Sequence, residues 1–202
     1  MGFHNICTCT LVREGLDMTG KRRKTILRTI RLSEEIDSLL EKDAQEQNIS
    51  TNALVSKIMT RYVEWDRAVE KLDFVSFSNT FFVALLNEVS DEKIQEMASQ
   101  EAIRQIKNQA MWDFGKTDFD MLLKTIILRG KYGIASHLSV ESWGEGNYVL
   151  TLHHRWGPKG VVFFRSFFDS FIRSELGVQP TIDVADNVLA ISFQKPLKGT
   201  TH

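Results

Sequence analysis

The sequence has little cysteine, and what it has lies in one place. Cys7 and Cys9 are the only two cysteines among 202 residues. Two thiols so close together cannot cross-link a core, which indicates an intracellular, reducing setting rather than a disulfide-stabilised secreted protein. A Cys-x-Cys pair binds soft metals only with further ligands, and His4 is the one candidate nearby. We therefore interpret both thiols as inert and predict no metal site.

The sequence also lacks a net charge of either sign and any long apolar run. Its 25 lysines and arginines almost balance 26 aspartates and glutamates, so any affinity for a polyanion must come from a local patch. No segment approaches the length of a membrane span, and the first residues lack a signal-peptide pattern. We expect a cytoplasmic protein that does not contact membranes.

Enzyme motifs are missing as well. The sequence contains no nucleophile elbow, no phosphate-binding glycine loop and no helical pair of metal-binding histidines. His153 and His154 are neighbours in a predicted strand, where successive side chains point to opposite faces and cannot easily share one ion. We predict a protein without enzymatic activity, catalytic residues, metal or cofactor, and we give these histidines structural or hydrogen-bonding roles.

Positive charge is instead concentrated in one short stretch. Residues 21–32, KRRKTILRTIRL, carry six basic residues and no acidic one. From Thr25 to Leu32 the residues alternate and include several β-branched side chains, which predicts a strand. After Ser33 the sign of the charge changes, because two glutamates follow. Ser-Glu-Glu predicts a helix N-cap and a first turn whose negative charges suit the helix dipole.

Two amphipathic helices are predicted after this strand. Their apolar faces are formed by Ile36, Leu39, Leu40 and Ala44 and by Leu54, Val55, Ile58, Tyr62 and Trp65. The sequence QNIS (47–50) separates them and provides a second N-cap in Ser50. A strand-helix-turn-helix unit of this size cannot bury a core alone, and its strand has no partner. We therefore expect a dimer in which two copies of the strand pair antiparallel.

The segment TIRLSEEIDSLLEKDAQEQNISTNALVSKIMTRYV, from Thr29 to Val63, resembles the ribbon-helix-helix family of DNA-binding proteins, the Arc, MetJ and CopG type. It shares that family's alternating strand, Leu-Ser-Glu-Glu junction, amphipathic helix, polar turn and second helix. The resemblance implies a homodimeric transcriptional regulator whose two-stranded β-ribbon enters the major groove of double-stranded DNA.

The resemblance also implies which residues contact DNA. They are Leu27, Thr29 and Arg31 at the bases, Arg28, Lys21, Arg22, Arg23 and Lys24 at phosphates or a neighbouring groove, and Ser50, Thr51 and Asn52 at the phosphate clamp of the second helix. Leu27 departs from the polar residue usual in the family, so it either touches a thymine methyl or marks a shorter base-reading register. The alternative to DNA contact is a solubilising basic tail and a Ser50 that only caps its own helix.

The predicted fold class is α+β, with a dimeric ribbon-helix-helix followed by helices and a C-terminal ββαββ antiparallel-sheet domain. We predict a flexible arm over 1–20, a DNA-binding domain over 21–72 and a sensor or oligomerisation domain over 73–198. The last domain is predicted to begin with a short strand, DFVSFS (73–78), and to continue with helices that start at Ser78, Ser90 and Thr117. Residues 135–195 then predict two hairpins around one helix, which Gly-Pro opens.

That last helix, 159–176, is unusually rich in phenylalanine. Phe163, Phe164, Phe167, Phe168 and Phe171 give an aromatic surface wider than one helix face needs. We interpret it as core, and the alternatives are a dimer interface or the wall of a ligand pocket. The order of elements around it is faintly similar to the half-domain of haem-nitric-oxide-binding and vinyl-reductase-like ligand-binding domains, and no ligand residue follows from that similarity.

We therefore expect a sequence-specific, dimeric DNA-binding transcriptional regulator with a C-terminal ligand-sensing or oligomerisation domain. Its partners would be double-stranded DNA, a second copy of the chain and a small-molecule effector. One alternative is an antitoxin-like or assembly protein whose C-terminal domain binds a protein partner. A minor alternative is a sensor of haem or of another small ligand.

Overall fold

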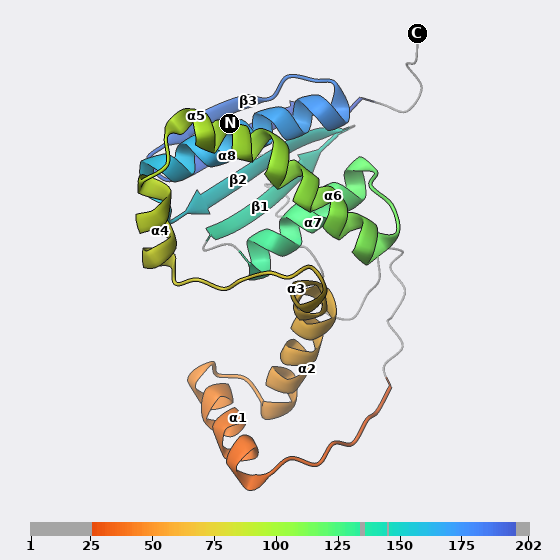
Figure 1. The fold of residues 1–202 in the computed structure, drawn as a ribbon. Coiled ribbons are helices and arrows are strands. Elements are labelled where there is room, and N and C mark those ends of the chain that lie inside the picture. The colour runs from red at the N-terminus through yellow and green to blue at the C-terminus, as the bar shows by residue number, and fades with distance from the viewer. Residues whose placement is uncertain (1–25, 134–135, 145, 197–202) are drawn as a thin grey trace, which may run out of the picture. The chain divides into compact units, whose positions relative to one another are not determined.

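The structure is a computed structural model that describes residues 26–133, 136–144 and 146–196. It has the predicted α+β class, and its contacts group into two units, residues 1–62 and 63–202 (Figure 1). Each unit is described by itself below. Within the described ranges, no helix combines the length and the apolar character that crossing a bilayer would require. The predicted arm over 1–20 lies outside the described residues.

The N-terminal unit contains two helices, α1 (Glu34–Glu46) and α2 (Thr51–Arg61). Both begin at the predicted serines. Ser33 Oγ accepts a hydrogen bond from the amide of Ile36 at 3.4 Å, and Ser50 Oγ accepts one from the amide of Ala53 at 3.1 Å. Each cap satisfies a backbone donor that the first helical turn leaves without a partner, which fixes where the helix starts.

The turn between α1 and α2 is a Schellman motif. Asn48 adopts a left-handed conformation with φ of 54°. The amide of Ile49 donates to the carbonyl of Ala44 at 3.0 Å, and the amide of Asn48 donates to that of Gln45 at 3.1 Å. These paired bonds satisfy the last carbonyls of α1 and end the helix, as the sequence QNIS predicted.

Residues 26–33 carry no regular secondary structure in the single chain, although residues 25–32 were predicted to form a strand. A strand is stabilised by hydrogen bonds to a neighbouring strand, and the predicted neighbour belongs to a second copy of the chain. The two-stranded ribbon therefore stays a prediction.

The chain continues through two short π-helical turns and six α-helices. They are η1 (Tyr62–Asp66), α3 (Arg67–Lys71), α4 (Asn79–Asn87), α5 (Asp91–Met97), η2 (Ala98–Ala102), α6 (Ile103–Phe114), α7 (Phe119–Tyr132) and α8 (Gly157–Leu176). Ser78 and Ser90 cap α4 and α5 as predicted. The predicted start of α7 is wrong by one residue, because Asp118 rather than Thr117 caps it and accepts from the amide of Met121 at 3.1 Å.

Residues 63–72, which the sequence assigned to the DNA-binding domain, group with the second unit. Trp65 and Ala68 are buried there. Glu64 accepts hydrogen bonds from Lys131 Nζ at 2.9 Å and from Tyr132 Oη at 2.7 Å. The second unit therefore begins inside the helical stretch that follows α2, and not at the loop after it.

Four strands form one antiparallel sheet in the order β1-β2-β4-β3: β1 (Ser136–Trp143), β2 (Asn147–His154), β3 (Thr181–Ala185) and β4 (Val188–Gln194). This confirms the predicted ββαββ arrangement. In the register of the sheet, Leu150 lies opposite Val140 on one side and Ile191 on the other. Residues 73–78 are not part of the sheet and link α3 to α4 irregularly, so the predicted strand there is wrong.

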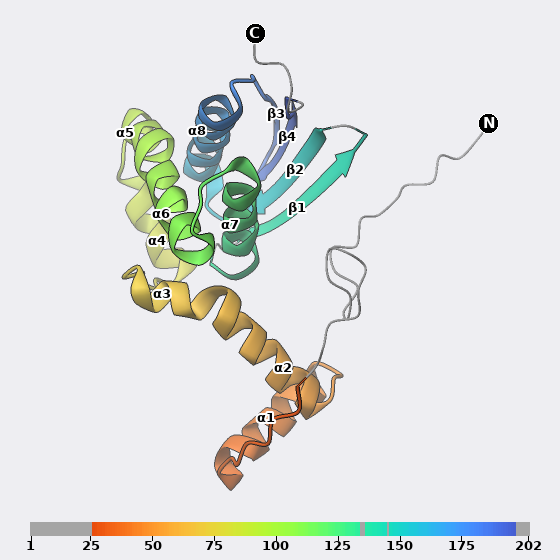
Figure 2. The same cartoon turned by 90° about the vertical axis from the view of Figure 1, so that its right-hand side faces the viewer.

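The core of the second unit lies between the sheet and α8. One face of the central strands contributes Leu150, Leu152, Leu189, Ile191 and Phe193, all of which are buried. Figure 2 shows α5, α6, α7 and α8 on one side of the sheet. The helix α8 packs against β3 and β4 and is itself contacted by α5 and η2, while α7 packs against α6 and β1.

Candidate functional site

The predicted base-contacting residues lie at the exposed start of the described N-terminal unit. The side chain of Leu27 is 91% exposed, and Arg28, Thr29 and Arg31 are exposed as well. The basic cluster at residues 21–24 lies outside the described residues. In a single chain these side chains have no ribbon to order them, so their grouping at a base-reading surface depends on the predicted dimer.

The N-terminus of α2 combines a side-chain cap with an unneutralised dipole. Ser50 uses its hydroxyl oxygen to cap the helix, Thr51 is half-buried and Asn52 is exposed. The first turn contains no acidic residue, so no carboxylate side chain opposes the positive end of the helix dipole. Capping by Ser50 and attraction of an anion are therefore compatible at this end.

The apolar side chains of the N-terminal unit find few partners within one chain. Among described residues 26–62, only Ala44 and Leu54 are buried, with 2% and 6% of their surfaces exposed. The large apolar side chains that remain exposed are Ile26, Leu27, Ile30, Leu32, Ile36, Leu39, Ile49, Ile58, Met59 and Tyr62. We call this set the exposed apolar surface of the N-terminal unit. An apolar surface of this extent usually marks an interaction site.

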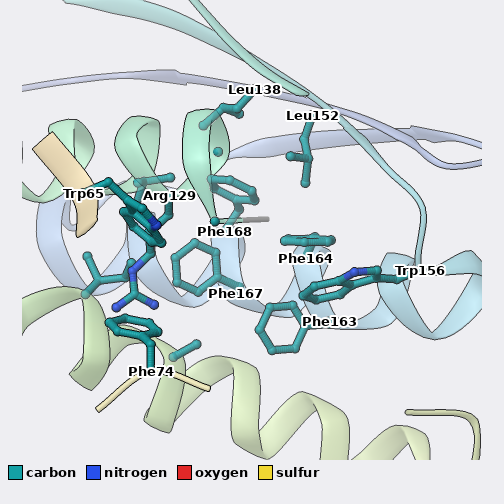
Figure 3. A pocket seen from close by; sticks show the side chains of 15 residues that line it. Trp65, Phe74, Arg129, Leu138, Leu152, Trp156, Phe163, Phe164, Phe167 and Phe168 are labelled. Carbon is teal, nitrogen blue, oxygen red and sulfur yellow. The ribbon is translucent and has the colours of Figure 1, made fainter. Parts of the chain in front are cut away.

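The second unit contains an apolar pocket with a volume of about 170 Å³ (Figure 3). The helix α8 supplies four of the residues that line it, Phe163, Phe164, Phe167 and Phe168. Of these, Phe164, Phe167 and Phe168 also belong to the buried core, as does Phe171. The phenylalanine-rich helix thus serves both as core, the preferred interpretation of the sequence, and as pocket wall, one of the alternatives.

Residues distant in the sequence close the pocket. Trp65 comes from η1, Phe74 from the link after α3 and Trp156 from the residue before α8. The rings of Trp65 and Phe74 lie 5.7 Å apart between centroids, and the Trp65 indole packs so closely on Gly133 that any side chain there would collide with it. Gly133 is therefore needed for the position of Trp65.

Among the described residues that line the pocket, Arg129 alone carries a charge. Its Nε donates to Gln109 Oε1 at 2.7 Å, and its Nη2 donates to the carbonyl of Gln105 at 3.3 Å. The guanidinium lies over the ring of Phe74, 5.0 Å from its centre, and Figure 3 shows it between that ring and Trp65. Burial lowers the pKa of Arg129 to about 10, although the negative charge of Asp113 acts to raise it. Arg129 therefore remains protonated at neutral pH.

A polar cluster on α6 lies behind Arg129. Gln109 is fully buried, and its Nε2 has no hydrogen-bond partner among the described residues, nor does Asp113 Oδ2. Burial raises the pKa of the Asp113 carboxyl. The Gln109 side chain and the charges of Arg67, Lys124 and Arg129 lower this pKa and offset part of the rise. Arg129 thus supplies the positive charge in the pocket lining, and Asp113 is an opposing carboxylate outside that lining.

The two adjacent histidines lie in different surroundings, as strand geometry predicts. His153 is exposed, whereas His154 is 5% exposed and its ring lies 5.2 Å from that of Phe164. His154 Nδ1 accepts from the amide of Trp156 at 3.3 Å. No group of three or more metal-binding side chains occurs in the part of the chain that the structure describes. The observed contacts of the His154 ring are thus one backbone hydrogen bond and aromatic packing.

Comparison with known protein families, with curated proteins and with solved structures found no match. The candidate sites therefore rest on the residues and their geometry.

Sequence reasoning did not identify Arg129, and it offered a pocket only as an alternative interpretation of the phenylalanine-rich helix. One signal was available, because Leu122, Ile126 and Arg129 follow one another at helical spacing and the first two are buried. An arginine on the buried face of a helix is unusual and points to a specific environment. The contributions of Trp65 and Phe74 left no comparable signal, since only the tertiary fold brings them together.

Proposed function

We propose that the chain is a sequence-specific, dimeric DNA-binding transcriptional regulator. Residues 25–32 of two copies pair as a β-ribbon in the major groove, with Leu27, Thr29 and Arg31 facing the bases. Arg28, the cluster at residues 21–24 and the N-terminus of α2 contact phosphates. The second unit senses a small molecule and alters DNA binding.

The observation that carries this proposal is the exposed apolar surface of the N-terminal unit. Burying one isoleucine or leucine contributes roughly 1.5–3 kcal/mol, and besides the base-facing Leu27 the single chain leaves nine large apolar side chains of this unit exposed. Two helices with correct caps and a specific turn, but almost no core of their own, require a partner. A second copy offers the same apolar surface in a two-fold arrangement, which favours the ribbon-helix-helix dimer.

The charges of this unit support a defined DNA-facing side. Arg28 and Arg31 precede Ser33, whereas the first turn of α1 carries Glu34, Glu35 and Asp37. Those carboxylates would be repelled by phosphates, so the start of α1 should stay away from DNA. The N-terminus of α2 lacks such carboxylates and is suited to an anion.

The pocket of the second unit favours ligand sensing over oligomerisation as the role of this domain. A largely apolar concavity with a few polar groups is the usual form of a small-molecule site. Haem iron is held by histidine, cysteine, methionine or tyrosine, and the described lining residues include none of these. The pocket therefore gives the haem alternative no support.

The test is selection of bound duplexes from a random pool, followed by fluorescence anisotropy on the full chain at several salt concentrations. We expect binding that weakens steeply with salt, because each neutralised phosphate releases counterions. Arg31→Ala should weaken binding to the selected duplex by at least about tenfold, the value of one good base contact. Arg173→Ala, at an exposed position of α8, removes the same charge elsewhere and should have little effect. Absence of salt-sensitive binding to any duplex would contradict the proposal.

A further inference from the structure

We propose that the pocket of the second unit binds a small aromatic carboxylate, with the ring among the aromatic side chains of α8 and the carboxylate against the Arg129 guanidinium. This names the chemical class of the effector. The binding site stands without any DNA-binding activity, and only its role as an effector site rests on the proposed function.

The size of the pocket sets the size of the ligand. An engineered apolar cavity of about 150 Å³ stays dry and binds benzene. The pocket here, at about 170 Å³, accommodates one ring with a short polar group. Its lining is mostly carbon, so water gains few hydrogen bonds inside it and is readily displaced by an apolar group.

The lining favours a ring over a chain. Phe163, Phe164 and Phe167 present ring faces and edges from successive turns of α8, and Trp156 stacks on Phe164 with centroids 4.9 Å apart. Offset and edge-to-face contacts between rings add to simple burial of area. An aliphatic acid of similar volume would bury comparable surface without these contacts.

The charge in the pocket favours an acid over a neutral ring. Arg129 has five N–H donors, and two of them bond to Gln109 and to the Gln105 carbonyl. Within the described ranges these are the two hydrogen bonds of the side chain, and the Asp113 carboxylate acts on it through its charge. A carboxylate would receive charge-assisted hydrogen bonds in a weakly polar environment, where they are strong.

The wider electrostatics also admit an anion. Arg129, Arg67 and Lys124 all act on the single carboxylate of Asp113. Lys124 acts on the carboxylate of Glu64 as well, so Arg129 is the one charge that lies in the described lining of the pocket. A ligand carboxylate would balance that charge, whereas a ligand cation would be repelled by it.

The experiment compares three probes on the full chain: benzoate, its neutral isostere benzamide and the aliphatic acid hexanoate. Trp65 and Trp156, two of the four tryptophans, line the pocket, so intrinsic fluorescence reports its occupancy. Thermal unfolding gives a second measurement, since a ligand of the folded state raises the midpoint. We expect saturable binding of benzoate at least about tenfold tighter than benzamide, the effect of one hydrogen bond to a charged group, and tighter than hexanoate.

Two variants separate the charge from the cavity. Arg129→Met should abolish the preference for benzoate over benzamide, whereas Arg173→Met, the same change at an exposed position of α8, should leave it intact. Ala102→Leu adds volume to the pocket wall while Arg129 itself is unchanged, and should weaken both ring probes by about tenfold or more. If Arg129→Met fails to fold, Arg129→Lys retains the charge and should keep a reduced preference.

The proposal is overturned if benzamide binds the wild-type chain as tightly as benzoate, if hexanoate binds better than benzoate, or if folded protein shows no saturable benzoate binding. The first result would assign Arg129 a purely structural role in joining α6 to α7. Benzoate binding without DNA binding would overturn the proposed function and support the binding site. DNA binding without benzoate binding would overturn the binding site and support the proposed function.

Discussion

His153 and His154 show how far one position in a strand changes the surroundings of a side chain. His153 is exposed on the outer face of the sheet, and His154 is buried against Phe164 with one ring nitrogen bonded to a backbone amide. His154 Nε2 has no hydrogen-bond partner among the described residues. Burial lowers the pKa of His154, because the charged imidazolium would lose its hydration there.

This burial leads to a prediction about acid stability. Below about pH 6.5 the unfolded chain protonates His154 more readily than the folded chain does, so stability falls as the pH drops. We expect the urea midpoint to fall between pH 7.5 and pH 5.5, and to fall less in His154→Gln than in wild type. His153→Gln, the matched exposed control, should keep the wild-type fall. Equal falls in all three proteins would contradict the assigned environment of His154.

At the residue scale, the sequence was informative where one local rule decides the outcome. Alternation in a strand placed the two histidines on opposite faces, and the serine caps follow from the needs of a helix N-terminus. Arg129 was not identified, because its role depends on Gln109, Phe74 and Asp113, which reach it through tertiary packing. The base-facing roles of Leu27, Thr29 and Arg31 stay predictions, since the ribbon that would order them needs a second chain.

At the scale of elements, the contact between η1 and the end of α7 positions one wall of the pocket. The Trp65 indole lies on Gly133 so closely that an added Cβ would collide with the ring. Trp65 is also stacked on Tyr132, with centroids 6.4 Å apart. The glycine thus allows a bulky aromatic residue to reach the core from a turn that begins the unit.

Gly133→Ala is expected to displace Trp65 and to destabilise the second unit by roughly 1–3 kcal/mol, the usual cost of overpacking. Urea unfolding followed by tryptophan fluorescence measures both effects. The double variant Gly133→Ala, Trp65→Phe provides the control, because the smaller ring leaves room for the new methyl group. Its destabilisation should be less than the sum of the two single changes. Strict additivity would show that the two residues do not compete for the same space.

The elements also show where local patterns mislead. The sequence DFVSFS alternates as a strand does, yet residues 74–78 are irregular and the four-stranded sheet is complete without them. A strand requires hydrogen bonds to a neighbouring strand, and alternation does not report whether the fold brings an edge such as that of β1 or β3 within reach. The two hairpins were predicted correctly because each strand has its partner a few residues away along the chain. Asp186 turns the second hairpin with φ of 51°.

At the scale of the whole molecule, the exposed apolar surface of the N-terminal unit predicts a dimer. Leu39→Glu places a charge in that surface and loses the burial of one leucine from each copy, at roughly 1.5–3 kcal/mol apiece. We expect the dimer to weaken by about a hundredfold or more in sedimentation velocity. Gln45→Glu introduces the same charge at an exposed polar position of α1 and should leave the dimer unchanged. A monomeric wild type at micromolar concentration would contradict the prediction.

The π-helical turn η1 limits how this chain can change in length during evolution. A π-turn contains one residue more than an α-helical turn, and each residue of a regular helix rotates its side chain by about 100°. Losing a single residue between 62 and 66 would turn Trp65 away from Phe74 and Gly133 and open the pocket. The exposed link at residues 75–78 has no such constraint. In related chains that keep this pocket, we therefore expect insertions and deletions to collect in the link and to be absent from η1.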